Sequence, residues 1–188
     1  MRWGLFIILA WLVILMQITI LGLIRIPIES LGVIMPDLMA GLAVFVVLRG
    51  KRLANVLIAV WILGLIVDLT NSSGAGQETV LGPMPIAYVL SAWIIFQARE
   101  VFFREWIITQ VLLAFAFTLL AHLVWVTWQC LAARDATTWQ DFGHLIVQAG
   151  LLAAYTAVIT PVMYMLLKPC QRFIFADQSG RSSRRRWG

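Results

Sequence analysis

Six apolar runs constrain this chain more than any other feature of its sequence. Each is 18 to 25 residues long, and a helix needs about 20 apolar residues to cross a hydrocarbon core about 30 Å thick. Of the 188 residues, 62% are hydrophobic and 12% are charged. A soluble chain this short could not bury so much apolar surface in one core. The sequence therefore predicts an all-α membrane protein, a bundle of about six transmembrane helices over residues 3–24, 31–48, 53–70, 79–98, 106–128 and 143–167.

Lysine and arginine are distributed unevenly between the two ends of these predicted helices. Twelve of the 14 fall at one set of helix ends or in the C-terminal tail, and only Arg25 and Arg134 fall at the other. Cytoplasmic segments of membrane proteins carry the excess of Lys and Arg. We therefore predict that both termini are cytoplasmic, that residues 1–168 form the transmembrane domain, and that residues 169–188 form a basic cytoplasmic tail.

The composition and the motifs argue against several classes of function. The net charge of +5 could suggest nucleic-acid binding, but the basic residues form short clusters between apolar runs and not one continuous face. Cys130 and Cys170 fall on opposite sides of the predicted membrane and lack neighbouring histidines, so neither a disulfide nor a zinc site is expected. Zinc-protease, serine-hydrolase, phosphate-binding and dinucleotide-binding motifs are absent from the sequence. We expect no metal, no cofactor, no nucleic-acid partner and no enzymatic activity.

Four ionisable side chains lie in or beside the apolar runs, where burial of a charge is costly. At about 1.5 Å per residue, Arg25, Asp37, Asp68 and His122 all fall towards the outer side of the membrane. One interpretation is a shared polar site for a ligand, a proton or a partner helix. The other is structural: Arg25 neutralises one aspartate, Pro36-Asp37 caps a helix start, and Asp68 reaches the interface. The sequence leaves both interpretations open.

Small residues recur at four-residue spacing on the sixth predicted helix, and the third has Gly64 four residues before Asp68. Gly64 shares a helix face with Asp68. The sixth helix carries two rows of small residues, the first Ala149, Ala153 and Ala157, the second Gly150 and Ala154. Such rows let helices approach closely in lipid. They serve either packing within the bundle or binding of a partner helix. Pro161 is expected to kink the sixth helix.

The predicted tail ends in three consecutive arginines, Arg184, Arg185 and Arg186. On the cytoplasmic side, anionic lipid headgroups attract each Lys or Arg by about 1 kcal/mol. The arginines are therefore candidates for anionic-lipid contact. The alternative is a solvated tail that only sets the orientation of the protein.

Two short segments together resemble a known family. Pro36-Asp37-Leu38 opens the second helix, which ends in a short basic turn, and Gly64-Leu65-Ile66-Val67-Asp68-Leu69 closes the third. In a chain of under 200 residues that is nearly all membrane, this pattern resembles the family of the rod shape-determining protein MreD. Residues 71–81 depart from the family pattern, because this loop is longer and more polar than is usual.

The resemblance implies a non-catalytic scaffold of the cell-wall (peptidoglycan) elongation complex that maintains rod cell shape in the bacterial cytoplasmic (inner) membrane. The partners it implies are MreC and, through MreC, MreB filaments and the glycosyltransferase–transpeptidase pair that builds the lateral wall. The family is also similar in fold to the substrate-binding subunits of vitamin transporters.

The alternative function is therefore a small-molecule-binding membrane subunit of a transporter. The two functions need different surfaces. A solute site needs a concave pocket with a few convergent polar groups, whereas a scaffold needs an exposed, lipid-facing groove of small residues.

Overall fold

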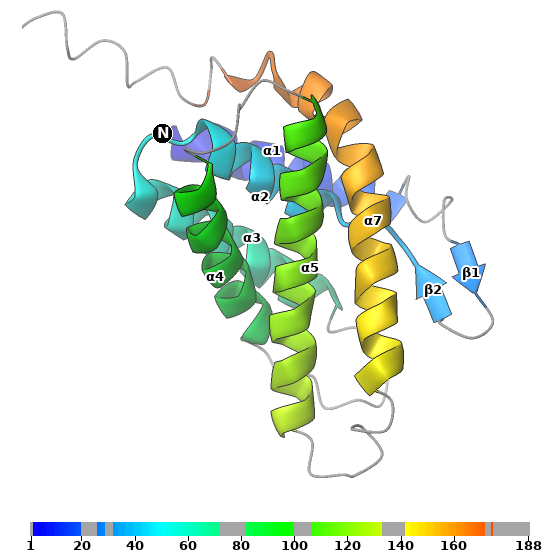
Figure 1. The fold of residues 1–188 in the computed structure, drawn as a ribbon. Coiled ribbons are helices and arrows are strands. Elements are labelled where there is room, and N and C mark those ends of the chain that lie inside the picture. Colours follow the sequence, from blue (N-terminus) through cyan, green and yellow to red (C-terminus); the bar gives the residue numbers. More distant parts are fainter. Residues whose placement is uncertain are drawn as a thin grey trace, which may run out of the picture.

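The computed structural model describes residues 2–19, 26–28, 32–71, 82–99, 107–132, 142–171 and 174. Over these ranges the chain is mainly helical, as predicted, and one small hairpin follows the first helix in the sequence and lies at the right of Figure 1, on the side of the helix labelled α7. The elements are α1 (Trp3–Thr19), β1 (Ile26–Ile28), β2 (Gly32–Ile34), α2 (Leu38–Arg49), α3 (Leu53–Asn71), α4 (Pro83–Ala98), α5 (Ile107–Ala132) and α7 (Phe142–Leu167).

Three of these helices are long and apolar enough to cross a membrane. The spans are Leu53–Thr70 in α3, Ile107–Trp128 in α5 and Phe142–Leu167 in α7. The other described helices are shorter, with 17 residues in α1, 12 in α2 and 16 in α4. At about 1.5 Å per residue, α2 is only about 18 Å long, well short of a hydrocarbon core of about 30 Å.

The predicted helix over residues 31–48 is wrong at its N-terminal end. β2 pairs antiparallel with β1, with Ile34 opposite Ile26, and the helix begins only at Leu38. Pro36 disfavours helical backbone at the residue before it. Asp37 is extended, with φ −97° and ψ 98°, and its side chain caps the helix start. Residues 20–24 of the first predicted helix and 79–81 of the fourth lie outside the described residues, and Gly82 precedes α4, which begins at Pro83.

Helix α2 is the centre of the molecule. Every residue from Leu38 to Leu48 is buried, and α1, α3, α4, α5 and α7 all contact it. A helix that is apolar on all sides is typical of such a fully enclosed position.

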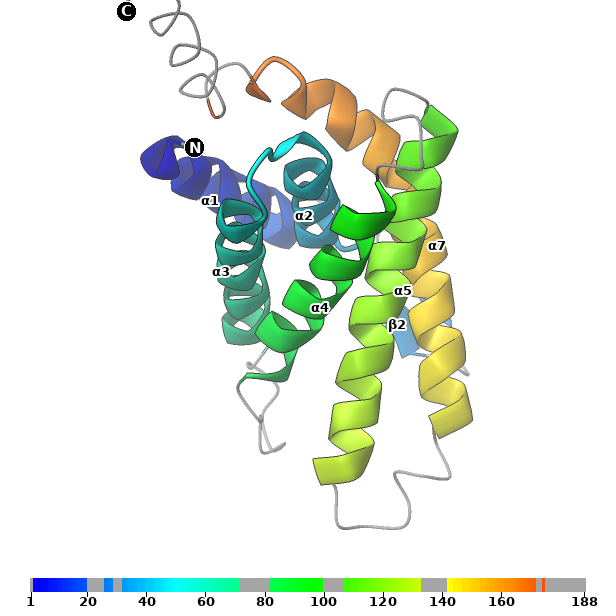
Figure 2. The same cartoon turned by 60° about the vertical axis from the view of Figure 1, so that its left-hand side comes forward.

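Helix α1 lies crosswise to α3 and α5 in both views of the fold (Figures 1 and 2). Its buried residues form a single stripe that packs on α2, namely Phe6, Ala10, Val13 and Ile14. The rest of α1 presents large apolar side chains outwards, including Ile8 and Trp11, which are 63% and 64% exposed. The helix is therefore attached to the bundle along one narrow face.

The described lysines and arginines gather at one end of the molecule. The start of α1, the start of α5 and the ends of α2, α4 and α7 lie there, at the top of Figure 1. The six described Lys and Arg residues belong to this end: Arg2, Arg49, Lys51, Arg52, Arg99 and Lys168. We call it the basic end. The end of α3 and the start of α4 lie at the opposite end.

Helix α7 changes direction between its yellow N-terminal part and its orange C-terminal part (Figures 1 and 2). Pro161 lies inside this helix, and an internal proline removes one helical hydrogen bond and bends the axis. The C-terminal part packs on α2, where the Tyr164 ring meets the Phe45 ring edge-on at a centroid distance of 5.3 Å. Met163 lies against Gly41 of α2.

Candidate functional site

Asp37 lies in the bundle interior, where polar groups from three helices meet. Its Oδ1 accepts hydrogen bonds from the backbone N–H groups of Met39 at 2.9 Å and Ala40 at 3.1 Å. Its Oδ2 accepts from the Tyr88 hydroxyl of α4 at 2.6 Å, and its own N–H donates to Thr156 Oγ1 of α7 at 2.9 Å. The side chain is only 6% exposed. Asp37 therefore caps α2 and fastens that helix to both α4 and α7.

Helix α1 contributes one weaker hydrogen bond to the network around Asp37. The Gln17 Oε1 atom accepts from the Met39 N–H at 3.3 Å. This N–H is shared with Asp37 Oδ1. The start of α2 is therefore bonded to side chains from α1, α4 and α7 as well as to its own cap.

Arg99 donates hydrogen bonds to carbonyl groups at the opposite end of α2. Its Nη1 donates to the carbonyl oxygens of Val47 at 2.6 Å and Gly50 at 2.5 Å, and its guanidinium lies 3.5 Å from the centre of the Phe96 ring. The last carbonyls of a helix have no donor within the helix. Because α2 is too short to bring both ends to water, side chains inside the bundle have to bond them.

Sequence reasoning missed Arg99, Tyr88 and Thr156 as members of this network. The sequence contains one indication that Tyr88 belongs to a network. A tyrosine inside an apolar run needs a hydrogen-bond partner for its hydroxyl when it is buried. The sequence does not say that the partner is Asp37, which is 51 residues away. Arg99 was interpreted only as one of the charges that set orientation.

Asp68 caps a different helix. Its Oδ2 accepts from the N–H of Gly82 at 2.7 Å, and Gly82 is the residue before α4, with a φ of 124° that favours glycine. Gly64, one turn earlier on α3, packs on the same helix start. A Cβ atom there would lie 2.7 Å from Pro85 Cα. The G-x-x-x-D pattern therefore joins the end of α3 to the start of α4.

The predicted shared polar site is not assembled among the described residues. His122 bonds within its own helix, with Nδ1 2.9 Å from the Thr118 carbonyl oxygen. Asp37, Asp68 and His122 each have separate partners. Arg25 lies outside the described residues, so its predicted pairing with an aspartate stays a prediction. Arg184, Arg185 and Arg186 also lie outside them.

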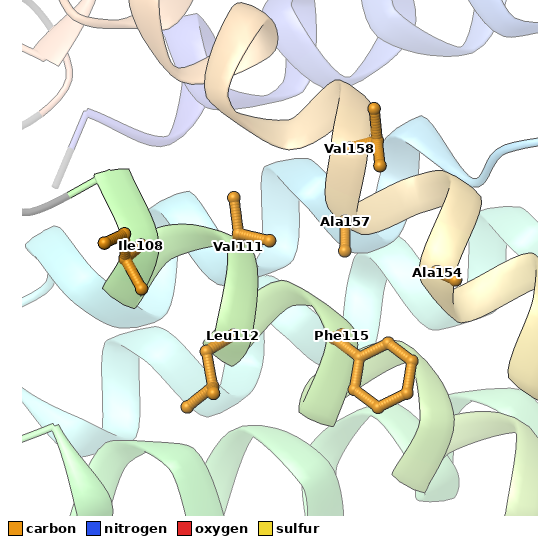
Figure 3. A pocket seen from close by; sticks show the side chains of 7 residues that line it. All are labelled: Ile108, Val111, Leu112, Phe115, Ala154, Ala157 and Val158. Atoms are coloured by element: carbon orange, nitrogen blue, oxygen red, sulfur yellow. The ribbon is translucent and has the colours of Figure 1, made fainter.

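An apolar groove runs between α5 and α7 on the outside of the bundle (Figure 3). Its volume is about 340 Å³. Seven apolar side chains line it: Ile108, Val111, Leu112 and Phe115 from α5, and Ala154, Ala157 and Val158 from α7. Both helices are long and apolar enough to cross a membrane. Ile108 and Val158 are 72% and 70% exposed, so the groove is open on the outer surface of the protein.

The two rows of small residues on α7 have different surroundings. Ala149, Ala153 and Ala157 are buried, at 3%, 0% and 3% exposure. Ala154 is exposed in the groove, and a Cβ added at Gly150 would meet nothing within 4 Å. Ala149 and Ala153 therefore pack within the bundle, and Ala157 is buried but also lines the groove. The second row leaves a free surface.

Within the described ranges, no three His, Cys, Asp or Glu side chains lie close enough together to hold a metal ion. Comparison with known proteins adds no further candidate, because neither a family model, nor a curated protein, nor a solved structure matches the chain.

Proposed function

We propose that this protein is a non-catalytic membrane scaffold that binds a partner transmembrane helix in the groove between α5 and α7. The observation that carries the proposal is the groove itself, an open apolar surface between two helices that are each long enough to cross a membrane. Helix association in lipid depends on close packing at small residues. The exposed Ala154 provides such a residue at the groove surface.

The geometry favours a scaffold over the transporter subunit. A hydrophilic solute would need polar groups that converge on a cavity. The side chains that line the groove are all apolar. In the core, Tyr88 and Thr156 are each hydrogen-bonded to Asp37.

The sequence resemblance supplies the identity of the partners in this proposal. The protein would act in the inner membrane of a rod-shaped bacterium as MreD does, holding MreC and, through it, MreB filaments and the wall-building enzyme pair. The basic end would face the cytoplasm, because Lys and Arg are in excess on that side of membrane proteins.

Orientation is tested by labelling an introduced cysteine. Lys51 is exposed at the basic end, so Lys51→Cys reports on that side, in a chain that also carries Cys130→Ser and Cys170→Ser. A membrane-impermeant maleimide should label it only after the membrane is permeabilised. Labelling in intact spheroplasts would reverse the proposed orientation. The native Cys130 is a poor reporter because it is 1% exposed.

Partner binding is tested by filling the groove. Ala154→Leu places a bulky side chain in the groove without entering the core, and Ala54→Leu is the matched control at an exposed alanine of α3. We expect Ala154→Leu to lower co-purification of MreC at least tenfold and to round the cells when it is the sole copy. Ala54→Leu should do neither.

The transporter alternative makes the opposite forecast for cells that lack the protein. Such cells would keep their rod shape and would grow normally when one small nutrient is supplied. Nutrient rescue with MreC association unchanged in the Ala154→Leu variant would refute the scaffold proposal.

A further inference from the structure

The basic end is a single surface that tertiary contacts assemble. The Arg2 N–H donates to the Ile174 carbonyl oxygen at 3.0 Å, which joins the start of α1 to the segment after α7. The Arg49 Nε donates to the Tyr164 hydroxyl, which joins the end of α2 to the last turn of α7. These bonds join segments of the basic end that are far apart in the sequence.

Two of the cations at this end are engaged inside the protein. Arg99 is buried and bonds the carbonyls that end α2. Arg49 is half-buried and lies over the Tyr164 ring at 5.3 Å. The remaining four are exposed, namely Arg2, Lys51, Arg52 and Lys168.

Carboxylates of the described chain do not neutralise these four cations. The described ranges contain two acidic residues, Asp37 and Asp68, and both are bonded at the starts of helices. In the whole sequence, residues 1–2, 49–52, 99–105 and 168–188 hold 12 Lys or Arg and only 3 Asp or Glu, a net charge of +9 (12 minus 3). Like charges held together repel, so an anion from outside the chain would bind here favourably.

The surroundings of the cations favour a phospholipid over an acidic protein segment. Lys168 comes three residues after Met165 and two after Leu166, which are 75% and 60% exposed on the last turn of α7. Arg2 directly precedes α1, whose Leu5 is also exposed. A phospholipid has a phosphate for the cation and an acyl chain for the adjacent apolar side chains. An acidic peptide would match only the cations.

We infer that the exposed cations of the basic end bind the headgroups of anionic phospholipids in the surrounding leaflet. Each Lys or Arg near an anionic membrane surface contributes about fivefold to binding. Removing two of the four should therefore weaken binding roughly 20- to 30-fold. This inference does not depend on the scaffold proposal, because the groove and the exposed cations are different surfaces.

The test compares two double variants of the full chain in neutral detergent. Lys51→Gln with Arg52→Gln removes both charges, and Lys51→Arg with Arg52→Lys retains them. Binding of phosphatidylglycerol and of phosphatidylcholine is measured by native mass spectrometry, and thermal melting confirms that each variant is folded. We expect tighter binding of phosphatidylglycerol to the native chain, the predicted loss in the first variant, and less than a twofold change in the second.

Three results would overturn the inference. The first is equal binding of the two lipids, and the second is unchanged phosphatidylglycerol binding in the folded charge-free variant. The third is displacement of phosphatidylglycerol by inorganic phosphate, which would identify a site for free anions. Failure of inorganic phosphate to compete would support a lipid source.

Discussion

The α3–α4 pair and the α5–α7 pair both have small residues on a helix face, yet these residues have different surroundings. In the first pair, Gly64 lies against the backbone of Pro85, and Asp68 bonds the residue before α4. In the second pair, Ala153 is buried but its neighbour Ala154 faces an open groove. A small residue gives close packing only where another backbone lies opposite. Where none does, the same sequence pattern leaves a concave surface that another molecule can fill.

The largest effect should come from adding volume at Gly64. A Cβ there would lie 2.7 Å from Pro85 Cα and 3.0 Å from the Met84 carbonyl oxygen. These are backbone atoms, so we expect Gly64→Ala to lower the free energy of unfolding by about 1–3 kcal/mol. Gly64→Leu should abolish the folded state. Unfolding in a denaturing-detergent titration measures both.

Gly150→Ala is the matched control for this substitution on α7. A Cβ at Gly150 meets nothing within 4 Å, and alanine is favoured over glycine inside a helix by about 0.8–1 kcal/mol. The two Gly→Ala changes should therefore have opposite signs. The same sign for both would mean that the α3–α4 contact is no closer than the packing around Gly150.

The next largest effect should come from Asp37→Ala. This change leaves the Tyr88 hydroxyl and the Ala40 N–H without their acceptor in a buried place, and leaves the Met39 N–H with only the 3.3 Å bond to Gln17 Oε1. Loss of the cap and of the buried bond together should cost about 2–4 kcal/mol. Asp37→Asn should lose much less, because the amide oxygen can still cap the helix. An Asn variant as unstable as the Ala variant would show that the charge, and not the bonding, matters.

Asp68→Ala should cost less than Asp37→Ala, about 1 kcal/mol. Asp68 is only half-buried and its loss removes the cap bond to Gly82. Combined with Gly64→Ala, the loss should be smaller than the sum, because both changes loosen the same junction. If the two stability losses are strictly additive, the packing of α3 on α4 and the bond from Asp68 to Gly82 stabilise the protein independently.

The predicted pairing of Arg25 is tested with the same aspartates. Leaving a buried charge unpaired costs more than removing both partners. If Arg25 pairs with Asp37 or Asp68, one of the double alanine variants should be more stable than the sum of its single changes predicts. Additive behaviour of both double variants would show that Arg25 pairs with neither.

The smallest effect on stability should come from Ala154→Leu. Ala154 is exposed, and exposed substitutions usually change stability by no more than about 0.5 kcal/mol. Ala153→Leu, one residue earlier, is the contrast, because Ala153 is 0% exposed and overpacking there should cost about 1–3 kcal/mol. Equal losses in the two variants, measured by the same detergent titration, would mean that the groove is filled within the protein itself.

The parts of the fold that follow from local sequence were predictable. The predicted runs 53–70, 106–128 and 143–167 match α3, α5 and α7 to within four residues at either end. A cap at Pro36-Asp37 was one of the two interpretations that the sequence left open, whereas the bond from Asp68 to Gly82 was not predicted. The hairpin of β1 and β2 was missed, because in an apolar stretch strand and helix residues look alike until a proline or a cap interrupts them.

The sequence by itself therefore determined that the chain is mainly helical and has apolar runs long enough to cross a membrane. It also determined the unequal distribution of cations between the two ends. Only the tertiary structure decided that α2 is enclosed, that Arg99 and Asp37 bond its two ends, and that Ala153 and Ala154 face different surroundings. The physical reason is that lipid and protein interior are both apolar, so hydrophobicity along a membrane helix does not distinguish a buried face from an exposed one. That distinction depends on which backbone lies opposite, and residues distant in the chain supply it.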